Sequence, residues 1–149
     1  MPAYFMSNVP GSIRPSADGA GFELAWLFRP ETRIPMLDVP RDFGKFVAAA
    51  LAETPGYRHA YAASGWFTPL DVCGAVERCT GKRCEFSEVP LERFGGSKEL
   101  LDNLLMIRDY EYYGPGAEEG VSRSQEVVGK VGGWEGFGSF EDFLRESGF

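Results

Sequence analysis

Apolar and polar positions recur with a helical period between Asp42 and Leu51, and this stretch organises the rest of the chain. Its apolar positions lie at spacings of three and one, which places them on one helical face: Phe43, Phe46, Val47, Ala50 and Leu51. We expect Asp42 to cap the helix, because its carboxylate can accept a hydrogen bond from a free N–H of the first turn. Residues 34–38 predict a short strand before it, and Thr54-Pro55-Gly56 predicts its end, because proline cannot donate the next hydrogen bond.

Two other segments carry the pattern of a capping box, in which the first polar side chain and the residue three positions later satisfy each other's backbone N–H groups. Thr68 and Asp71 predict a helix that ends at Gly81. Its buried positions should be Val72, Cys73, Val76 and Cys79. Ser139 and Asp142 predict a last helix with an inward face made of Phe140, Phe143 and Leu144.

A further helix is predicted after Ser97, which is a suitable cap. Its apolar face is broad: Leu100, Leu101, Leu104, Leu105 and Ile107. Tyr110, Tyr112 and Tyr113 follow before glycine and proline close it. Residues 116–138 are rich in glycine and predict a long irregular loop, a kind of segment that is usually functional or disordered.

The remaining apolar segments predict strands. Residues 22–28 (FELAWLF) show mixed alternation, and residues 83–89 alternate charged with apolar positions, as in a half-exposed strand. Residues 59–64 (HAYAAS) form a short run of small apolar residues, which is typical of a buried parallel strand. Strands that alternate with helices in this way indicate an α/β fold.

The composition argues against several classes of function. The net charge of −7 argues against nucleic-acid binding, which requires a basic surface. No apolar run reaches the roughly 18 residues of a membrane span and no leader is evident, so we expect no membrane partner. Three cysteines without C-x-x-C spacing favour a reducing, cytoplasmic setting, and a single histidine, His59, makes a metal site improbable.

Four segments in the same order resemble the NmrA-like family, which consists of atypical short-chain dehydrogenases/reductases. They are PAYFMSN (2–8), LDVPRDFGKFVAAAL (37–51), TPLDVCGAVERCTGKRCEFSEVP (68–90) and SFEDFLRESGF (139–149). The similarity runs over residues 1–149 but corresponds to the C-terminal half of a family member. It therefore implies the C-terminal part of a Rossmann-type NAD(P)-binding fold with the small substrate-side lobe, the glycine-rich nucleotide-binding half being absent.

The resemblance also implies site residues. It places Phe5, Met6, Ser7 and Asn8 beside the nicotinamide end of a bound NADP or NAD, whereas the alternative is an N-terminal element that simply packs. The family helix that corresponds to residues 97–113 borders the substrate cleft, so the resemblance places Tyr110 and Tyr113 at a substrate pocket. Aromatic packing at a helix end is the alternative there.

The sequence itself lacks the chemistry of a complete enzyme. A dinucleotide site needs a glycine-rich turn between a strand and a helix, and neither Gly114-Pro115-Gly116 nor Gly129-Lys130-Val131-Gly132 fits that pattern. None of the six tyrosines is followed by lysine four positions later, so the superfamily's Tyr-x-x-x-Lys pair is absent. Ser64 has no suitable base, because an odd offset on one strand directs His59 to the opposite face. We therefore expect no catalytic residue and no NAD(P) binding by this chain alone.

The sequence thus favours an NmrA-like fragment with an ancestral role in redox sensing or in NAD(P)H-dependent reduction of a small molecule. Whether such a protein is an enzyme stays open. One alternative is a truncated paralogue that acts as a protein-interaction module, pairing with itself or with a full-length homologue. Another is an active enzyme whose remaining half comes from a second chain.

Overall fold

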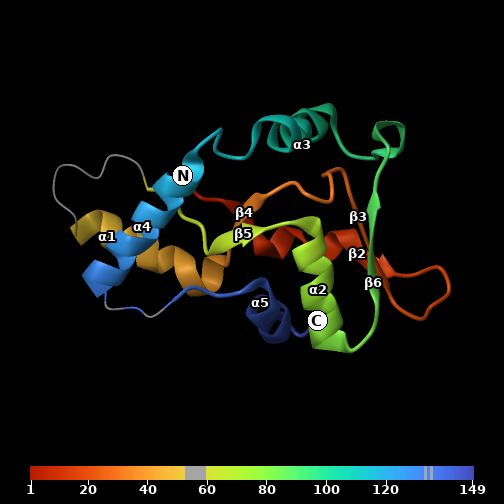
Figure 1. The fold of residues 1–149 in the computed structure, drawn as a ribbon, viewed down its shortest axis with the longest axis horizontal. Helices are drawn as coiled ribbons and strands as arrows, with labels where there is room; N and C mark the ends of the chain where they lie inside the picture. Colours follow the sequence, from red (N-terminus) through yellow and green to blue (C-terminus); the bar gives the residue numbers. More distant parts are fainter. Residues whose placement is uncertain (53–59, 133, 135) are drawn as a thin grey trace.

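The computed structural model describes residues 1–52, 60–132, 134 and 136–149, which form a mixed α/β fold with two small sheets (Figure 1). The first sheet has the strand order β1-β4-β5. Its strands are β1 (Tyr4–Phe5), β4 (Ile34–Leu37) and β5 (Gly65–Phe67). β1 runs parallel to β4, and β5 runs antiparallel to it. All four residues of β4 are buried, as expected for a central strand.

The second sheet has the order β2-β3-β6. Its strands are β2 (Ile13–Pro15), β3 (Phe22–Trp26) and β6 (Cys84–Glu88). β2 and β3 form an antiparallel pair, and β6 runs parallel to β3. The strands predicted from residues 22–28 and 83–89 are therefore confirmed.

Helix α2 (Pro69–Thr80) begins and ends where its signals predict, and helix α5 (Phe140–Ser147) begins directly after Ser139, as its capping signal predicts. Both capping boxes are formed, and Gly81 closes α2 in the left-handed conformation. α2 packs against both β6 and α5. Burial raises the pKa of the Cys73 thiol, which makes this cysteine a core residue and not a reactive one.

Helix α3 (Lys98–Tyr110) follows a short 3₁₀ turn, η4 (Leu91–Arg93), and lies along one long edge of the molecule (Figure 1). The Ser97 hydroxyl accepts a hydrogen bond from the N–H of Leu100, as predicted. Leu104 and Ile107 are buried, whereas Leu100 remains 48% exposed. Only part of the broad apolar face is therefore used by the core.

The predicted loop over residues 116–138 is wrong over most of its length, because α4 (Ala117–Gly132) occupies it. The inward positions of α4 are Ala117, Val121, Ser124 and Val128, which recur at helical spacing. Glycines and polar residues occupy most of the other positions and conceal this narrow stripe. α4 packs on α1 (Gly44–Ala52), and this tertiary contact outweighs the low helix propensity of the glycines.

The predicted orientation of α1 is also wrong. A π-helical turn, η3 (Val39–Phe43), precedes α1 and is capped by Asp38, so Asp42 is not the N-cap. Asp42 is instead fully buried. The buried apolar side chains of α1 are Phe46 and Ala49, while Val47 and Leu51 are 43% and 83% exposed. The wider turn of η3 changes the rotational phase of the helix, which a strict 3.6-residue period does not anticipate.

The strand predicted over residues 59–64 is only partly correct. His59 and Thr54-Pro55-Gly56 lie outside the described residues. Ala62 forms one parallel bridge with Pro2, but the regular strand starts at Gly65 and is antiparallel. Around this segment lies a smaller core that is separate from the main one and joins the end of β4, α1 and α4.

Candidate functional site

A cleft of about 590 Å³ opens where β1, the C-terminal end of β3 and α3 meet. This volume is in the range of small-molecule sites. Aromatic side chains make up much of its wall: Tyr4, Phe5, Trp26, Phe94 and Tyr112. Four further cavities among the described residues are smaller, with volumes of about 250 to 330 Å³.

The floor of the cleft is formed where β1 ends and the chain turns. Tyr4 pairs with Met36 in the parallel ladder, and the chain then turns through η1 (Met6–Asn8). This turn leaves Phe5 and Asn8 on the cleft. The Tyr4 ring meets Trp26 edge to face, with centroids 5.9 Å apart, so the aromatic floor is a packed layer.

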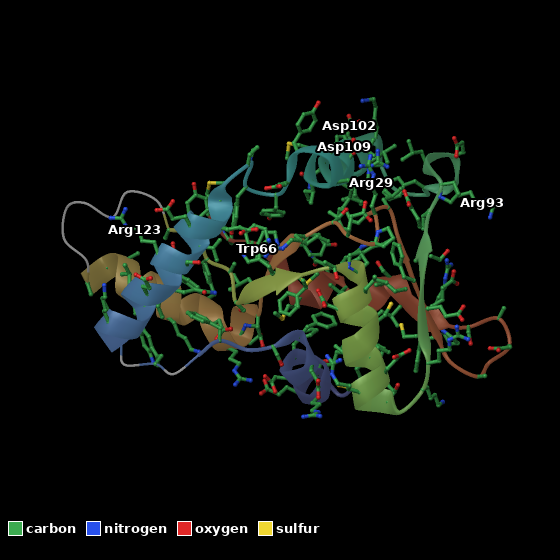
Figure 2. The ribbon with its side chains drawn as sticks, in the orientation of Figure 1. Arg29, Trp66, Arg93, Asp102, Asp109 and Arg123 are labelled. Carbon is green, nitrogen blue, oxygen red and sulfur yellow. The ribbon has the colours of Figure 1, made fainter. Side chains whose placement is uncertain are left out.

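Helix α3 forms the opposite wall. Leu100, Asn103 and Leu104 line the cleft from adjacent turns, as their spacing of three and four dictates. The far end of α3 is tied to the segment after β3 by Arg29 and Asp109, which lie side by side in Figure 2 with a nitrogen–oxygen distance of 3.4 Å. Because this ion pair is exposed, it helps to position the helix and adds little to its stability.

The lining of the cleft carries no charged side chain among the described residues. Its polar groups are the amides of Asn8 and Asn103 and the hydroxyls of Ser12, Tyr4 and Tyr112. Burial raises the pKa of Tyr4 and that of Tyr112, so both phenols stay protonated near neutral pH. The cleft is therefore suited to holding an uncharged, flat group by stacking and neutral hydrogen bonds, and it offers no side chain tuned for proton transfer.

The four residues expected at the cofactor separate into two groups. Phe5 and Asn8 line the cleft. Met6 is 0% exposed and belongs to the main core, and Ser7 is exposed outside the lining. The turn of η1 explains the division, because consecutive residues of a 3₁₀ turn point about a third of a turn apart.

The two tyrosines expected at a substrate pocket do not line this cleft. Tyr110 is 72% exposed at the end of α3. Tyr113 packs against Tyr61, and its hydroxyl donates a 3.0 Å hydrogen bond to the carbonyl of Met1. Tyr112, which lies between them, does line the cleft.

Sequence reasoning did not identify Trp26, Phe94 and Asn103 as site residues. Asn103 could have been found, because it lies one turn after Leu100 on the predicted helix. Trp26 and Phe94 reach the cleft through tertiary packing, for which the local sequence holds no signal.

The described residues do not offer a place for the phosphates of a dinucleotide. Gly114 and Gly116 have positive φ angles of 85° and 79° and precede α4, but they follow a helix instead of a strand. The first turn of α4 carries Glu118 and Glu119, which repel an anion at that helix end. The second glycine pair, Gly129 and Gly132, lies inside α4.

Other forms of chemistry are not supported in the described part of the chain. No cluster of three or more metal-ligating side chains occurs there. The hydroxyl of Ser64 donates to the carboxylate of Asp42 at 2.6 Å, which ties it into a buried structural network. None of the helices in the described ranges is both long and apolar enough to cross a membrane.

The comparisons with known proteins identify the fold. No family model matches the sequence, and no curated protein matches it either. Among solved structures, the chain is similar to NmrA, a negative transcriptional regulator, in complex with NADP (TM-score 0.69, 20% identity) and in complex with NAD (TM-score 0.70, 20% identity). A further crystal form of NmrA gives a TM-score of 0.72 at 17% identity.

Each of these alignments covers 97% of this chain and 50% of the NmrA chain. The protein therefore has an NmrA-like fold and spans about half the length of the solved structures that it matches.

Proposed function

We propose that this chain is the substrate-side half of an NmrA-like NAD(P)-binding unit, whose role is redox sensing or reduction of a small molecule. The observation that carries the proposal is the uncharged aromatic cleft beside Phe5 and Asn8. A nicotinamide ring is flat and bears a carboxamide, which suits a floor of aromatic rings and a facing amide. Two of the NmrA structures that share the fold are complexes with NADP and with NAD, which supports this class of ligand.

The phosphates of the dinucleotide would be held elsewhere. Because the described residues offer no glycine-rich turn between a strand and a helix, the proposal requires that a second segment or chain supplies it. The chemistry of the bound group would be hydride donation or acceptance. The residues of this chain would bind and orient its nicotinamide end.

Calorimetric titration of NADPH and NADH tests the proposal. The chain alone should bind both more weakly than millimolar, because the phosphate contacts supply much of the affinity. Addition of the N-terminal half of an NmrA protein should bring binding into the micromolar range. Asn8→Ala should weaken that restored binding, whereas Ser7→Ala, a neighbour outside the cleft, should not. Micromolar binding by the chain alone would contradict the proposal that a second segment or chain holds the phosphates.

A second function, that of a protein-interaction module, is favoured by a different observation. α1 presents apolar side chains to solvent, and Val47 and Leu51 are among the exposed large residues. Exposed apolar stripes of this kind mark surfaces that partners cover. In this alternative the chain would pair with itself or with a full-length homologue.

A further inference from the structure

A smaller groove of about 250 Å³ adjoins the aromatic cleft. Ser12, Ala25, Val89 and Phe94 line both cavities, so the two cavities are direct neighbours. The groove differs from the cleft in charge, because Arg14 and Arg93 are among the residues that line it. The combined site thus has an uncharged aromatic part and a cationic end.

Both guanidinium groups can donate hydrogen bonds to an anionic ligand. The Nε of Arg14 lies 3.3 Å from the Glu23 carboxylate, which leaves its two terminal nitrogens available. Arg93 forms no salt bridge with the part of the chain that the structure describes. Its side chain extends from η4 into solvent (Figure 2), so the long, flexible stem can swing over the groove when a ligand arrives. On a chain with a net charge of −7, two arginines beside one cavity form a local exception.

We propose that the cleft and the groove together bind a small molecule that has a flat, uncharged aromatic body and one anionic group. The aromatic body would lie between Trp26 and the α3 wall, and the anionic group would meet Arg14 and Arg93. Carboxylate, sulfonate and phosphate groups share the planar or forked acceptor geometry that guanidinium recognises. The inference rests on the proposed function, in that it names the ligand class of the same cleft.

A matched pair of probes tests the charge requirement. Anilinonaphthalene sulfonate and phenylnaphthylamine share an aromatic body, and only the first carries an anionic group. Fluorescence titration at low salt should show about tenfold tighter binding of the sulfonate, and added salt should reduce this advantage through screening. Ala25→Phe fills the junction of the two cavities and should weaken both probes.

The arginine variants separate recognition of the anionic group from binding of the aromatic body. Arg14→Gln combined with Arg93→Gln should lower the affinity for the sulfonate about tenfold and leave phenylnaphthylamine binding unchanged. Arg123→Gln removes an exposed arginine of α4 at the opposite end of the molecule (Figure 2) and should change neither probe. Because all three arginines are exposed, the fold should tolerate these changes.

Each outcome has a defined meaning. Equal binding of both probes, or equal loss of sulfonate binding in Arg123→Gln, would overturn the anionic ligand class and leave the cleft intact as a site for neutral groups. Binding of both probes that is insensitive to Ala25→Phe would show that the probes bind outside the cleft and would overturn this ligand class, whereas the proposed function is decided separately by the NADPH and NADH titration.

Discussion

At the scale of single residues, Asp42 forms the densest buried polar network of the described structure. Its carboxylate accepts hydrogen bonds from the Ser64 hydroxyl at 2.6 Å, from the Gly138 N–H at 2.9 Å and from the Lys45 ammonium at 2.7 Å. These partners come from the segment before β5, the segment before α5 and helix α1. A buried carboxylate is tolerated only when it is paired and hydrogen-bonded, and here both oxygens are satisfied.

Asp42→Ala should therefore lower the free energy of unfolding by roughly 2–5 kcal/mol, since it leaves several buried donors unpaired. A simple capping role would cost less, about 0.5–2 kcal/mol. Urea denaturation of the variant measures the difference. Asp102→Ala is the control, because Asp102 lies exposed on α3 (Figure 2) in a surface pair with Lys98. Similar losses in the two variants would contradict the network role.

Asp38, which caps η3, behaves differently because its ionised form is disfavoured. Burial raises the pKa of the Asp38 carboxyl, and the nearby charges of Asp42 and Glu146 act in the same direction, opposed by the Arg41 backbone N–H and side chain. The folded state therefore binds the proton more tightly than the unfolded state does. This contribution to stability is fully present below the unfolded pKa of about 3.9 and is lost as pH rises through the folded pKa.

Asp38→Asn should consequently stabilise the protein near neutral pH, because asparagine keeps a capping oxygen without the charge. The gain relative to the wild-type chain should shrink as the pH is lowered toward about 4. Thermal or urea melts of the variant and the wild-type chain between neutral pH and about pH 4 test the direction of this pH dependence. A gain that grows on acidification would show that the ionised carboxylate is the preferred form.

At the scale of elements, α1 and α4 show how packing overrides local pattern. The two helices form one of the most extensive contacts between elements, and it buries Phe46 and Ala49 of α1. Phe46 also stacks on Phe137, with ring centroids 5.2 Å apart. The opposite face of the same helix stays in solvent, so adjacent positions of equal hydrophobicity have different roles.

Phe46→Ala should cost roughly 3–5 kcal/mol of unfolding free energy, as expected for a large side chain removed from a packed core. Val47→Ala, one position along, should cost less than about 1 kcal/mol because Val47 is 43% exposed. Urea melts of the two variants give the comparison. The reverse order would show that the Val47 face is covered in solution.

The helices differ in how well the sequence alone predicts them. The starts of α2 and α5 and the end of α2 at Gly81 were predictable, because a capping box and a C-terminal glycine are local signals of a few residues. α4 was hidden because its inward stripe is narrow and the glycines around it lower the helix propensity, and the phase of α1 depends on the π-helical turn η3 that precedes it. In the candidate site, Phe5 and Asn8 followed from family resemblance, whereas Trp26 reaches the cleft only through the packing of distant strands.

At the scale of the whole molecule, the accessible surface is larger than the mass requires. The chain of 16.5 kDa exposes 8568 Å². A compact monomer of this mass is expected to expose roughly 7,500 Å². The excess is comparable to the roughly 800 Å² that each partner buries in a standard protein interface. The exposed stripe of α1, made of Phe43, Val47, Ala50 and Leu51, is a natural part of that excess.

We therefore expect the chain to associate through the α1 stripe, either with a second copy or with a full-length relative. Light scattering of the purified chain over a dilution series should show a mass that falls toward 16.5 kDa as the protein is diluted. Val47→Lys combined with Leu51→Lys should shift the chain to a monomer at all concentrations, since it places like charges on the interface. Both positions are exposed, so the free energy of unfolding of the monomer should change little.

Leu70→Lys supplies the matched control, because Leu70 is 57% exposed on α2, a different helix. It should leave the association unchanged. Loss of association in both variants would indicate a general solubility effect of added charge and not a specific surface. A wild-type chain that stays monomeric throughout the series would mean that the α1 stripe is stable in water and that the protein needs no partner to cover it.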